Sequence, residues 1–383
     1  DLNIVFDWFQ RQTTGMLVKA DQVAYEIGLS SMPKVNGGDM RTRGWEVQVD
    51  YNHSFNKDFR IYATATLADS KAKITKWGTN TGAITGYYEG KEWGEIWGFQ
   101  TADAYFTADE AANGVVIYDG SRVGINEVYQ KALYKSGFRY GEGDVKYEDL
   151  NGDGKVDSGK GTIDDHGDLI RIGNTTPRYE YNFRVDLGYK GFDLSLFFQG
   201  VGAKQMWGSS HLSIPGFDTG GGCMAQAFAE DFWYETIVDG KVVDANYDAF
   251  YPRAYNLGTA STGFNMQVSD KYLLDMSYLR LKNVTLGYSL PEKLLKKAFI
   301  NKLRVYVSLE NYLTFDNLNG LPIDVEETPG YSSFNSSNYN LGRAGVGTPT
   351  FKSASFGVQL TFSSAGANIA ALYTSSKVQR FWT

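Results

Sequence analysis

The sequence predicts an all-β protein, and within that class an antiparallel transmembrane β-barrel with long extracellular loops. Alternating apolar and polar residues, alternating short and long connections, and aromatic residues near the ends of the apolar faces support this prediction. The alternation is clearest in the last expected strand, residues 351–362. Its apolar face carries Ala354, Phe356, Val358, Leu360 and Phe362. The central question is whether protein or lipid covers such a face.

The composition suits strands and turns and excludes several functions. The 383 residues include 26 Tyr, 23 Phe and 43 Gly but only 8 Pro, and aromatic residues are enriched in strands. The net charge of −7 offers no basic footprint for nucleic acid. A single cysteine, Cys223, excludes an internal disulfide framework, and three histidines argue against a His-rich metal site.

The sequence has no apolar run of 18 residues, so it contains no transmembrane helix. A strand that crosses a membrane hides its apolar residues at every second position, where average hydropathy does not detect them. The sequence opens at Asp1 in the middle of an alternating pattern. We therefore interpret it as a C-terminal piece of a longer protein.

Nine strands are expected, each from a run of alternating polarity. They cover residues 2–10, 15–20, 45–52, 59–67, 179–189, 192–199, 277–290, 303–315 and 351–362. The second of these is the weakest. In the seventh, the apolar positions change from odd to even numbers near Asn283. One extra residue produces such a slip, so we predict a β-bulge there.

The connections alternate between short and long along the whole chain. Short ones are expected at 11–14, 53–58, 188–191 and 291–301, the last with a turn of helix at 293–298; long ones are expected at 21–40, 69–177, 200–275 and 316–350. Bacterial transmembrane barrels have short periplasmic turns and longer extracellular loops. A soluble β-sandwich or solenoid is the alternative, but nothing in those folds forces the long loops onto one end.

Several blocks of the sequence resemble one protein family. Residues 278–288 read YLRLKNVTLGY and are followed by Pro291, which resembles the signature of the SusC/RagA family, the TonB-dependent outer-membrane transporters of Bacteroidetes. The strand at 303–315, the middle block with DLNGD at 149–153, IGN at 172–174, Pro177 and YKGFDLS at 189–195, and the closing SFGVQLTF also resemble this family.

The resemblance implies a barrel of about 22 strands with an N-terminal plug. Residues 1–362 would then form the C-terminal part of the barrel, roughly its last nine or more strands, while the plug and the TonB box would lie outside this chain. Phe362 matches the family's terminal aromatic residue, which serves as the barrel-assembly signal. Residues 363–383 extend beyond that match, and their placement is unclear.

The implied function is TonB-dependent import of a nutrient, either a glycan oligosaccharide or an oligopeptide, across the bacterial outer membrane. A SusD-like surface lipoprotein would cap the barrel, and TonB-ExbB-ExbD would drive it. Two alternatives are a secreted or surface β-rich binding module, such as a calcium-stabilised adhesin or lectin, and a passive porin.

An acidic stretch has the spacing of a calcium loop. Asp149, Asn151 and Asp153 occupy alternate positions, Gly154 permits a sharp turn, and Lys155 would offer its carbonyl oxygen. Lys160 stands where a closing acid belongs. By its spacing from Gly173 in the family's pattern, Asp168 is the expected closing ligand, with 158–162 as an insertion, and Asp157 or Asp165 could take the ninth position. The alternative is a solvated acidic turn without an ion.

Aromatic residues in the long connections are candidates for substrate or partner contacts, because their rings suit both sugar faces and protein surfaces. The candidates are Trp93, Trp97, Trp207, Phe217, Trp233 and Tyr234. The alternative is that these rings pack the loops onto one another. The sequence has no G-x-S-x-G or H-E-x-x-H motif and no histidine paired with a nucleophile motif, so no enzymatic activity is expected.

Overall fold

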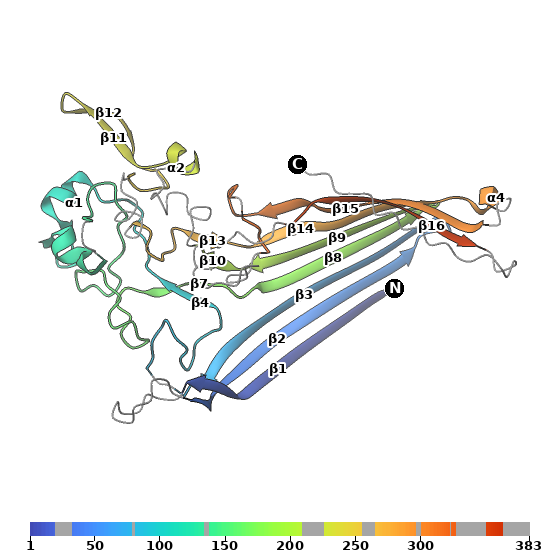
Figure 1. Ribbon diagram of the computed structural model, residues 1–383, viewed down its shortest axis with the longest axis horizontal. Helices are drawn as coiled ribbons and strands as arrows, with labels where there is room; N and C mark the ends of the chain where they lie inside the picture. The colour runs from blue at the N-terminus through green and yellow to red at the C-terminus, as the bar shows by residue number, and fades with distance from the viewer. Residues whose placement is uncertain are drawn as a thin grey trace.

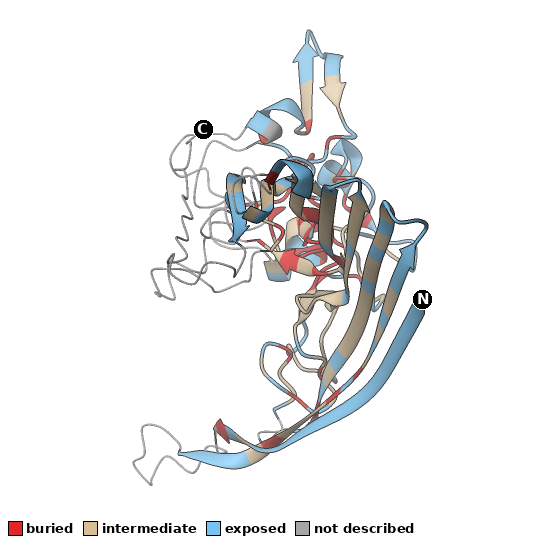
Figure 2. Cartoon of the chain, turned by 90° about the vertical axis from the view of Figure 1, so that its right-hand side faces the viewer, coloured by how far each residue is buried: buried red, intermediate tan, exposed pale blue. Residues whose placement is uncertain are grey.

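Eight long strands form one antiparallel sheet in the computed structural model, which describes residues 1–19, 33–78, 81–133, 138–208, 226–254, 265–295, 300–321, 323–326 and 350–362. The order across the sheet follows the order along the chain (Figure 1). The strands are β1 (Leu2–Lys19), β2 (Lys34–Ser54), β3 (Phe59–Lys76), β8 (Arg178–Tyr189), β9 (Phe192–Ala203), β14 (Tyr278–Ser289), β15 (Ile300–Asp316) and β16 (Ser353–Phe362). The sheet is strongly curved (Figure 2).

Short and long connections leave opposite ends of this sheet, as the sequence predicts. The turns β2–β3, β8–β9 and β14–β15 lie at the right-hand end in Figure 1, and the last contains the short helix α4 (Glu292–Leu295). The connections β3–β8 and β9–β14 extend from the left-hand end. At the β8–β9 turn, Lys190 and Gly191 have φ angles of 45° and 91°, and a type I′ hairpin turn requires positive φ at both central residues.

The turn expected at 11–14 and the separate strand expected at 15–20 are wrong. Strand β1 continues through both, and its pairing with β2 shifts register on either side of Met16. Gly15 has φ of 67° and donates its N–H to Asp39 Oδ1 at 2.9 Å. The turn-like residues therefore form a bulge within one strand, and the described sheet has eight strands where nine were expected.

The β-bulge predicted near Asn283 is confirmed. Strand β14 shifts register between Leu281 and Asn283 against both of its neighbours, β9 and β15. Lys282 is the extra residue. The bulge keeps Leu281 and Val284 on the same face although their numbers differ by an odd interval.

The apolar positions of neighbouring strands are in register, so they form continuous rows across the sheet. One row joins six strands and consists of Ile61, Leu187, Leu194, Leu286, Val307 and Phe356. The adjacent row is polar and consists of Tyr62, Asp186, Ser195, Thr285, Ser308 and Ser355. Leu286 and Phe356 expose 52% and 59% of their surface. Within the described chain, no second layer of protein covers the apolar rows.

The long connections fold into units of their own beyond the sheet. They contain the paired short strands β4 (Glu95–Gly98) with β7 (Ile170–Asn174), β5 (Val115–Val116) with β6 (Arg122–Val123), β10 (Gln205–Trp207) with β13 (Leu273–Asp275), and β11 (Tyr234–Val238) with β12 (Lys241–Asn246). The helices are α1 (Ala108–Asn113), the π-helix η2 (Ile125–Tyr129), the 3-10 helix η3 (Lys131–Leu133) and α2 (Gln226–Glu230). None of the helices in the described ranges is long and apolar enough to span a membrane.

A hydrophobic core holds the β3–β8 connection and the β9–β14 connection together. It joins rings from 99–147, such as Phe106 and Tyr147, to Trp233 and Ala249 of the later connection. Hydrogen bonds to the backbone of this core satisfy a buried glutamine beside it. The buried Gln130 donates to Val145 O at 3.2 Å and accepts from Tyr147 N at 2.8 Å. Such a core gives the long connections a fixed shape.

The last long connection is tied to the sheet by an ionic network at the bulge. Arg280 is 6% exposed, and its Nη2 donates to Asp324 Oδ1 at 2.8 Å while its Nε donates to Thr314 Oγ1 at 3.0 Å. Lys282 Nζ lies 2.8 Å from Glu326 Oε1. Asp324 also accepts a hydrogen bond from Thr350. The stretch 323–326 is therefore held against the polar face of the sheet.

Charge on the apolar rows should prevent membrane assembly. Replacing Val358 or Leu360 with Arg puts a charge into hydrocarbon, at a cost of about 2–4 kcal/mol near the bilayer midplane. We expect less folded barrel in the membrane fraction, measured by heat-modifiable migration of the full-length protein. The matched control is Ser355→Arg in the polar row, which should assemble normally. Equal assembly of all three variants would contradict the assigned facing.

The stabilisation that the ionic network around Asp324 provides should be lost at low pH. Burial alone raises the pKa of Asp324, but hydrogen bonds from Thr350, the Glu326 amide and Arg280 outweigh it, so the pKa lies below its ordinary value of 3.8. A carboxylate whose folded pKa is lowered stabilises the fold above the unfolded pKa, and this stabilisation is lost as the pH falls through the folded pKa. We expect the protection factors against hydrogen exchange at 318–321 and 323–326, which correct for the intrinsic rate at each pH, to be large at pH 7 and to fall only below about pH 3.8.

The variant Asp324→Asn should show faster exchange at 318–321 and 323–326 even at pH 7. A hydrogen bond to a charged group contributes about 1.5–3 kcal/mol, which corresponds to roughly 10- to 150-fold in exchange. Asp58→Asn, in the exposed β2–β3 turn, serves as the control. Unchanged protection in Asp324→Asn would show that the network does not hold this stretch.

Candidate functional site

The polar face of the sheet forms a hollow of about 440 Å³ where β8, β9, β14 and β15 meet. Its lining consists of Arg184, Asp186, Asp193, Ser195, Phe197, Asn283, Thr285 and Arg304. Arg304 forms a two-pronged ion pair with Asp193, with Nε 2.9 Å from Oδ1. Arg184 pairs with Asp186 of its own strand at 2.8 Å. The charges are balanced, and hydroxyl and amide groups separate them, so the hollow is suited to binding polar molecules.

Strand register explains why these residues share one surface. Asp186, Ser195 and Thr285 are direct neighbours across the sheet. The hollow contains no histidine or cysteine. It therefore offers hydrogen bonds and balanced charge but no nucleophile with a neighbouring base.

A second polar cluster lies around Glu95, near the start of the β3–β8 connection. The side chain of Glu95 is 2% exposed. It accepts hydrogen bonds from Tyr88 Oη and, at 2.9 Å, from Trp97 Nε1. Burial and the neighbouring Glu95 carboxylate raise the pKa of Tyr88 to about 12. Lys91 donates to Gly86 O at 2.7 Å and lies over the ring of Tyr88.

The structure gives different roles to the aromatic candidates. Trp93 is 44% exposed and stacks on Tyr87 with ring centroids 5.3 Å apart, so its outer face is open to a ligand. Trp97 is fixed by Glu95 and lies 5.3 Å from the ring of His166.

The other candidates are more strongly involved in packing. Trp233 is 6% exposed and belongs to the core of the long connections, so it packs the loops onto one another. Trp207 lies 6.5 Å from Tyr272. Tyr234 donates its hydroxyl to Asp244 across the β11–β12 hairpin at 3.1 Å. Phe217 and the tail 363–383 fall outside the described residues, whereas Phe362 ends β16 and is 50% exposed.

The acidic stretch closes on itself through backbone hydrogen bonds. Asp149 accepts from the N–H groups of residues 152, 153 and 154 at 2.7–3.2 Å. Asp168 accepts from residues 150, 151 and 157 at 2.8–3.3 Å. Burial and the nearby Asp149 raise the pKa of Asp168, although the three amides act in the opposite direction.

The remaining acids of this stretch are held by lysines. Lys155 Nζ lies 2.5 Å from Asp157 and 3.5 Å from Asp153, and Lys160 lies 3.3 Å from Asp165. Asn151 Oδ1 accepts from Asp153 N at 2.9 Å. Across the described residues, no three acidic, histidine or cysteine side chains converge as a metal site requires. In this arrangement backbone amides and lysines occupy the oxygen atoms of the predicted ligands, and calcium binding by this stretch stays a prediction.

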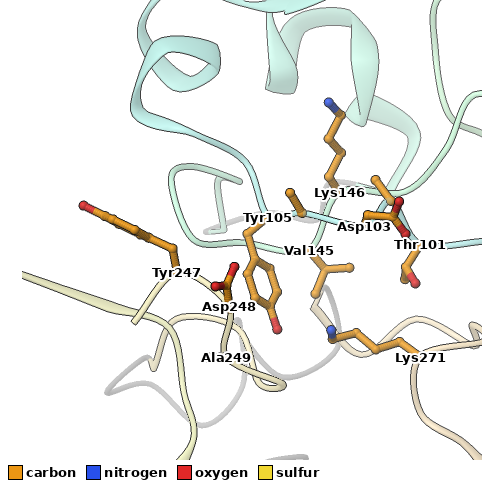
Figure 3. Close-up of a pocket in the computed structure, with 11 residues that line it drawn as sticks. Thr101, Asp103, Tyr105, Val145, Lys146, Tyr247, Asp248, Ala249 and Lys271 are labelled. Carbon is orange, nitrogen blue, oxygen red and sulfur yellow. The ribbon is translucent and has the colours of Figure 1, made fainter. Parts of the chain in front are cut away.

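A small cavity of about 120 Å³ lies between the β3–β8 connection and the β9–β14 connection (Figure 3). Residues 101–105 and 145–146 line one side, and residues 247–249 and Lys271 line the other. Lys271 Nζ lies 4.9 Å from the ring centroid of Tyr105 and 5.0 Å from that of Phe250. Burial lowers the pKa of Lys271. This lysine carries no signal in the sequence, because residues from three distant segments surround it.

Known proteins similar to this chain are TonB-dependent receptors. No protein-family model matches. The receptors P3 and P26 of Formosa agariphila are 24% and 22% identical to it over 372 and 371 residues. These alignments cover 94% and 93% of this chain but only 32% of each relative. The chain therefore spans about a third of the length of these curated relatives.

Solved structures show the same fold. The chain matches a structure of the RagAB peptide transporter with a TM-score of 0.60 at 20% identity, covering 94% of this chain and 33% of the other. A RagAB peptide importer in the closed-closed state matches with a TM-score of 0.59, also at 20% identity, with the same coverage. Together with the signature block at the β14 bulge and the alternating connections, these similarities support the resemblance of this chain to the SusC/RagA family of TonB-dependent outer-membrane transporters.

Proposed function

We propose that this chain forms part of the barrel wall of an importer that carries a nutrient across the bacterial outer membrane under the control of TonB. The observation that carries this proposal is the register of the exposed apolar rows with a polar face behind them. Such a sheet is suited to lipid on one side and to a solvated interior on the other.

The arrangement favours an importer over the two other candidates. A secreted binding module would expose its apolar rows to water, and soluble proteins rarely expose contiguous apolar patches of this extent. A passive porin keeps a continuous aqueous channel. Here the stretch 323–326 is fixed to the polar face, and the β3–β8 and β9–β14 connections form a packed unit. This arrangement suits regulated passage better than an open pore.

The proposed substrate is a glycan oligosaccharide or an oligopeptide. Either would find hydroxyl, amide and paired charged groups in the hollow around Arg304 and Asp193. Trp93 offers an open ring face that could contact a sugar or an apolar side chain. The proposed partners are a SusD-like surface lipoprotein on the side of the long connections and TonB-ExbB-ExbD on the other side.

The proposal is tested on the full-length protein in its own membrane. We expect uptake of a labelled oligosaccharide or oligopeptide mixture to require both this protein and TonB. Uptake that persists without TonB would support a porin instead. A protein that fractionates with the aqueous phase and stays monomeric without detergent would overturn the barrel itself.

Calcium binding by the acidic stretch remains a proposal. Its spacing supports it, as does the desolvated Asp168 carboxylate near Asp149. Binding would require Lys155 to leave and Asp153 and Asp157 to turn toward Asp168. We expect added calcium to protect residues 149–168 from protease, and to do so at lower concentration in Lys155→Met, because that variant lacks the competing ammonium group.

The control for this experiment is Lys57→Met in the exposed β2–β3 turn, which should respond to calcium like the unmodified protein. Equal protease protection with calcium and with chelator, in both the unmodified protein and Lys155→Met, would reject the ion. The stretch would then be a solvated acidic turn closed by its own hydrogen bonds.

A further inference from the structure

Lys271 is a half-buried cation whose N–H groups have no acceptor within the described residues. It forms no ion pair there, and its ammonium group is held over the rings of Tyr105 and Phe250. A cation gains energy from the faces of aromatic rings, but this contact gives the three N–H donors no acceptor among the described residues. The donors are therefore free to bind water or an acceptor on a ligand.

The two carboxylates that act on the charge of Lys271, Asp270 and Asp231, have other hydrogen-bond partners. Asp270 Oδ1 accepts from the backbone N–H and the hydroxyl of Thr101 at 3.0 Å and 2.7 Å. Asp231 accepts from Asn246 Nδ2 at 3.3 Å and from Phe250 N at 3.2 Å. Both attract Lys271 from a distance, but neither forms an ion pair with it within the described residues.

The second lysine of the cavity differs in this respect. Lys146 Nζ lies 2.6 Å from Glu110 Oε1, and Figure 3 shows its side chain directed away from Lys271. The two aspartates of the lining, Asp103 and Asp248, are exposed, so water screens their charge. Lys271 is therefore the cationic group of this cavity that remains available to a ligand.

We propose that Lys271 anchors a subsite that binds a carboxylate group of the imported ligand. The volume of about 120 Å³ admits such a group and its neighbouring atoms but not a whole oligomer. The proposal rests on the import function proposed above and specifies its substrate as acidic. Two ligands supply this chemistry, namely a peptide with a free C-terminus and an oligosaccharide that contains a uronic acid.

The test compares acidic and neutral probes on the full-length transporter in detergent. Tetra-alanine is measured against its C-terminal amide, and a galacturonic acid tetramer against a galactose tetramer. We expect at least one acidic probe to bind about tenfold more tightly than its neutral partner, because a charge-assisted hydrogen bond is stronger than a neutral one. Which pair shows the preference distinguishes a peptide from a uronate.

Variants of Lys271 test whether this residue causes the preference for acidic probes over neutral ones. Lys271→Met keeps the aliphatic packing and should bring the two probes of a pair within about twofold of each other, whereas Lys271→Arg should retain the preference. Lys241→Met, on the exposed strand β12, is the matched control and should behave like the unmodified protein. Equal binding of acidic and neutral probes by the unmodified protein, or a preference that survives in Lys271→Met, would overturn the subsite.

Import assays separate this proposal from the proposed function. Import of acidic and neutral probes with equal affinity for both would overturn the subsite and leave the import function intact. Absence of import for every probe, with the carboxylate preference retained in binding, would overturn the import function and support the subsite.

Discussion

The whole sheet depends on the constraint that hydrocarbon imposes on a strand. In a membrane, each backbone N–H and C=O group must be paired within the protein, and each outward side chain must be apolar. Antiparallel pairing meets the first condition between neighbouring strands, and within the described residues it leaves the outer edges of β1 and β16 for partners beyond this sheet. The rows that join Ile61 to Phe356 meet the second. A slip of one residue in any strand would turn its polar side chains outward.

The β14 bulge shows how one extra residue serves both faces of the sheet. Before the bulge, Leu279 and Leu281 keep the apolar face, while Arg280 and Lys282 both reach the acids at 323–326. After it, Asn283 donates to Ser308 at 2.9 Å across the polar face. The signature block at 278–288 thus combines an outward apolar row with a cationic anchor for a distant segment. Without the extra residue, Lys282 would occupy a regular position of the ladder.

The sequence was sufficient to predict features that depend on local periodicity. Alternation located the principal strands, the phase change revealed the bulge near Asn283, and the order of the connections was right after β1. The prediction failed at 11–14, because a Thr-Thr-Gly segment has the same local signal in a turn and in a bulge, and only pairing with β2 distinguishes them. The site was less predictable, because ion pairs such as Arg304 with Asp193 join residues more than 100 positions apart.

The same limit explains why aromatic residues in the long connections have unequal roles. Composition alone cannot separate Trp233, which packs into the core beside Gly143, from Trp93, which stacks on Tyr87 with one face free. The core formed by the β3–β8 and β9–β14 connections decides between them. By burying Trp233 and Tyr147 it fixes the backbone around Lys271, so that an ammonium group on a loop is held over two rings. A flexible loop would let that lysine reach a surface carboxylate, and its N–H donors would then bind that carboxylate instead of a ligand.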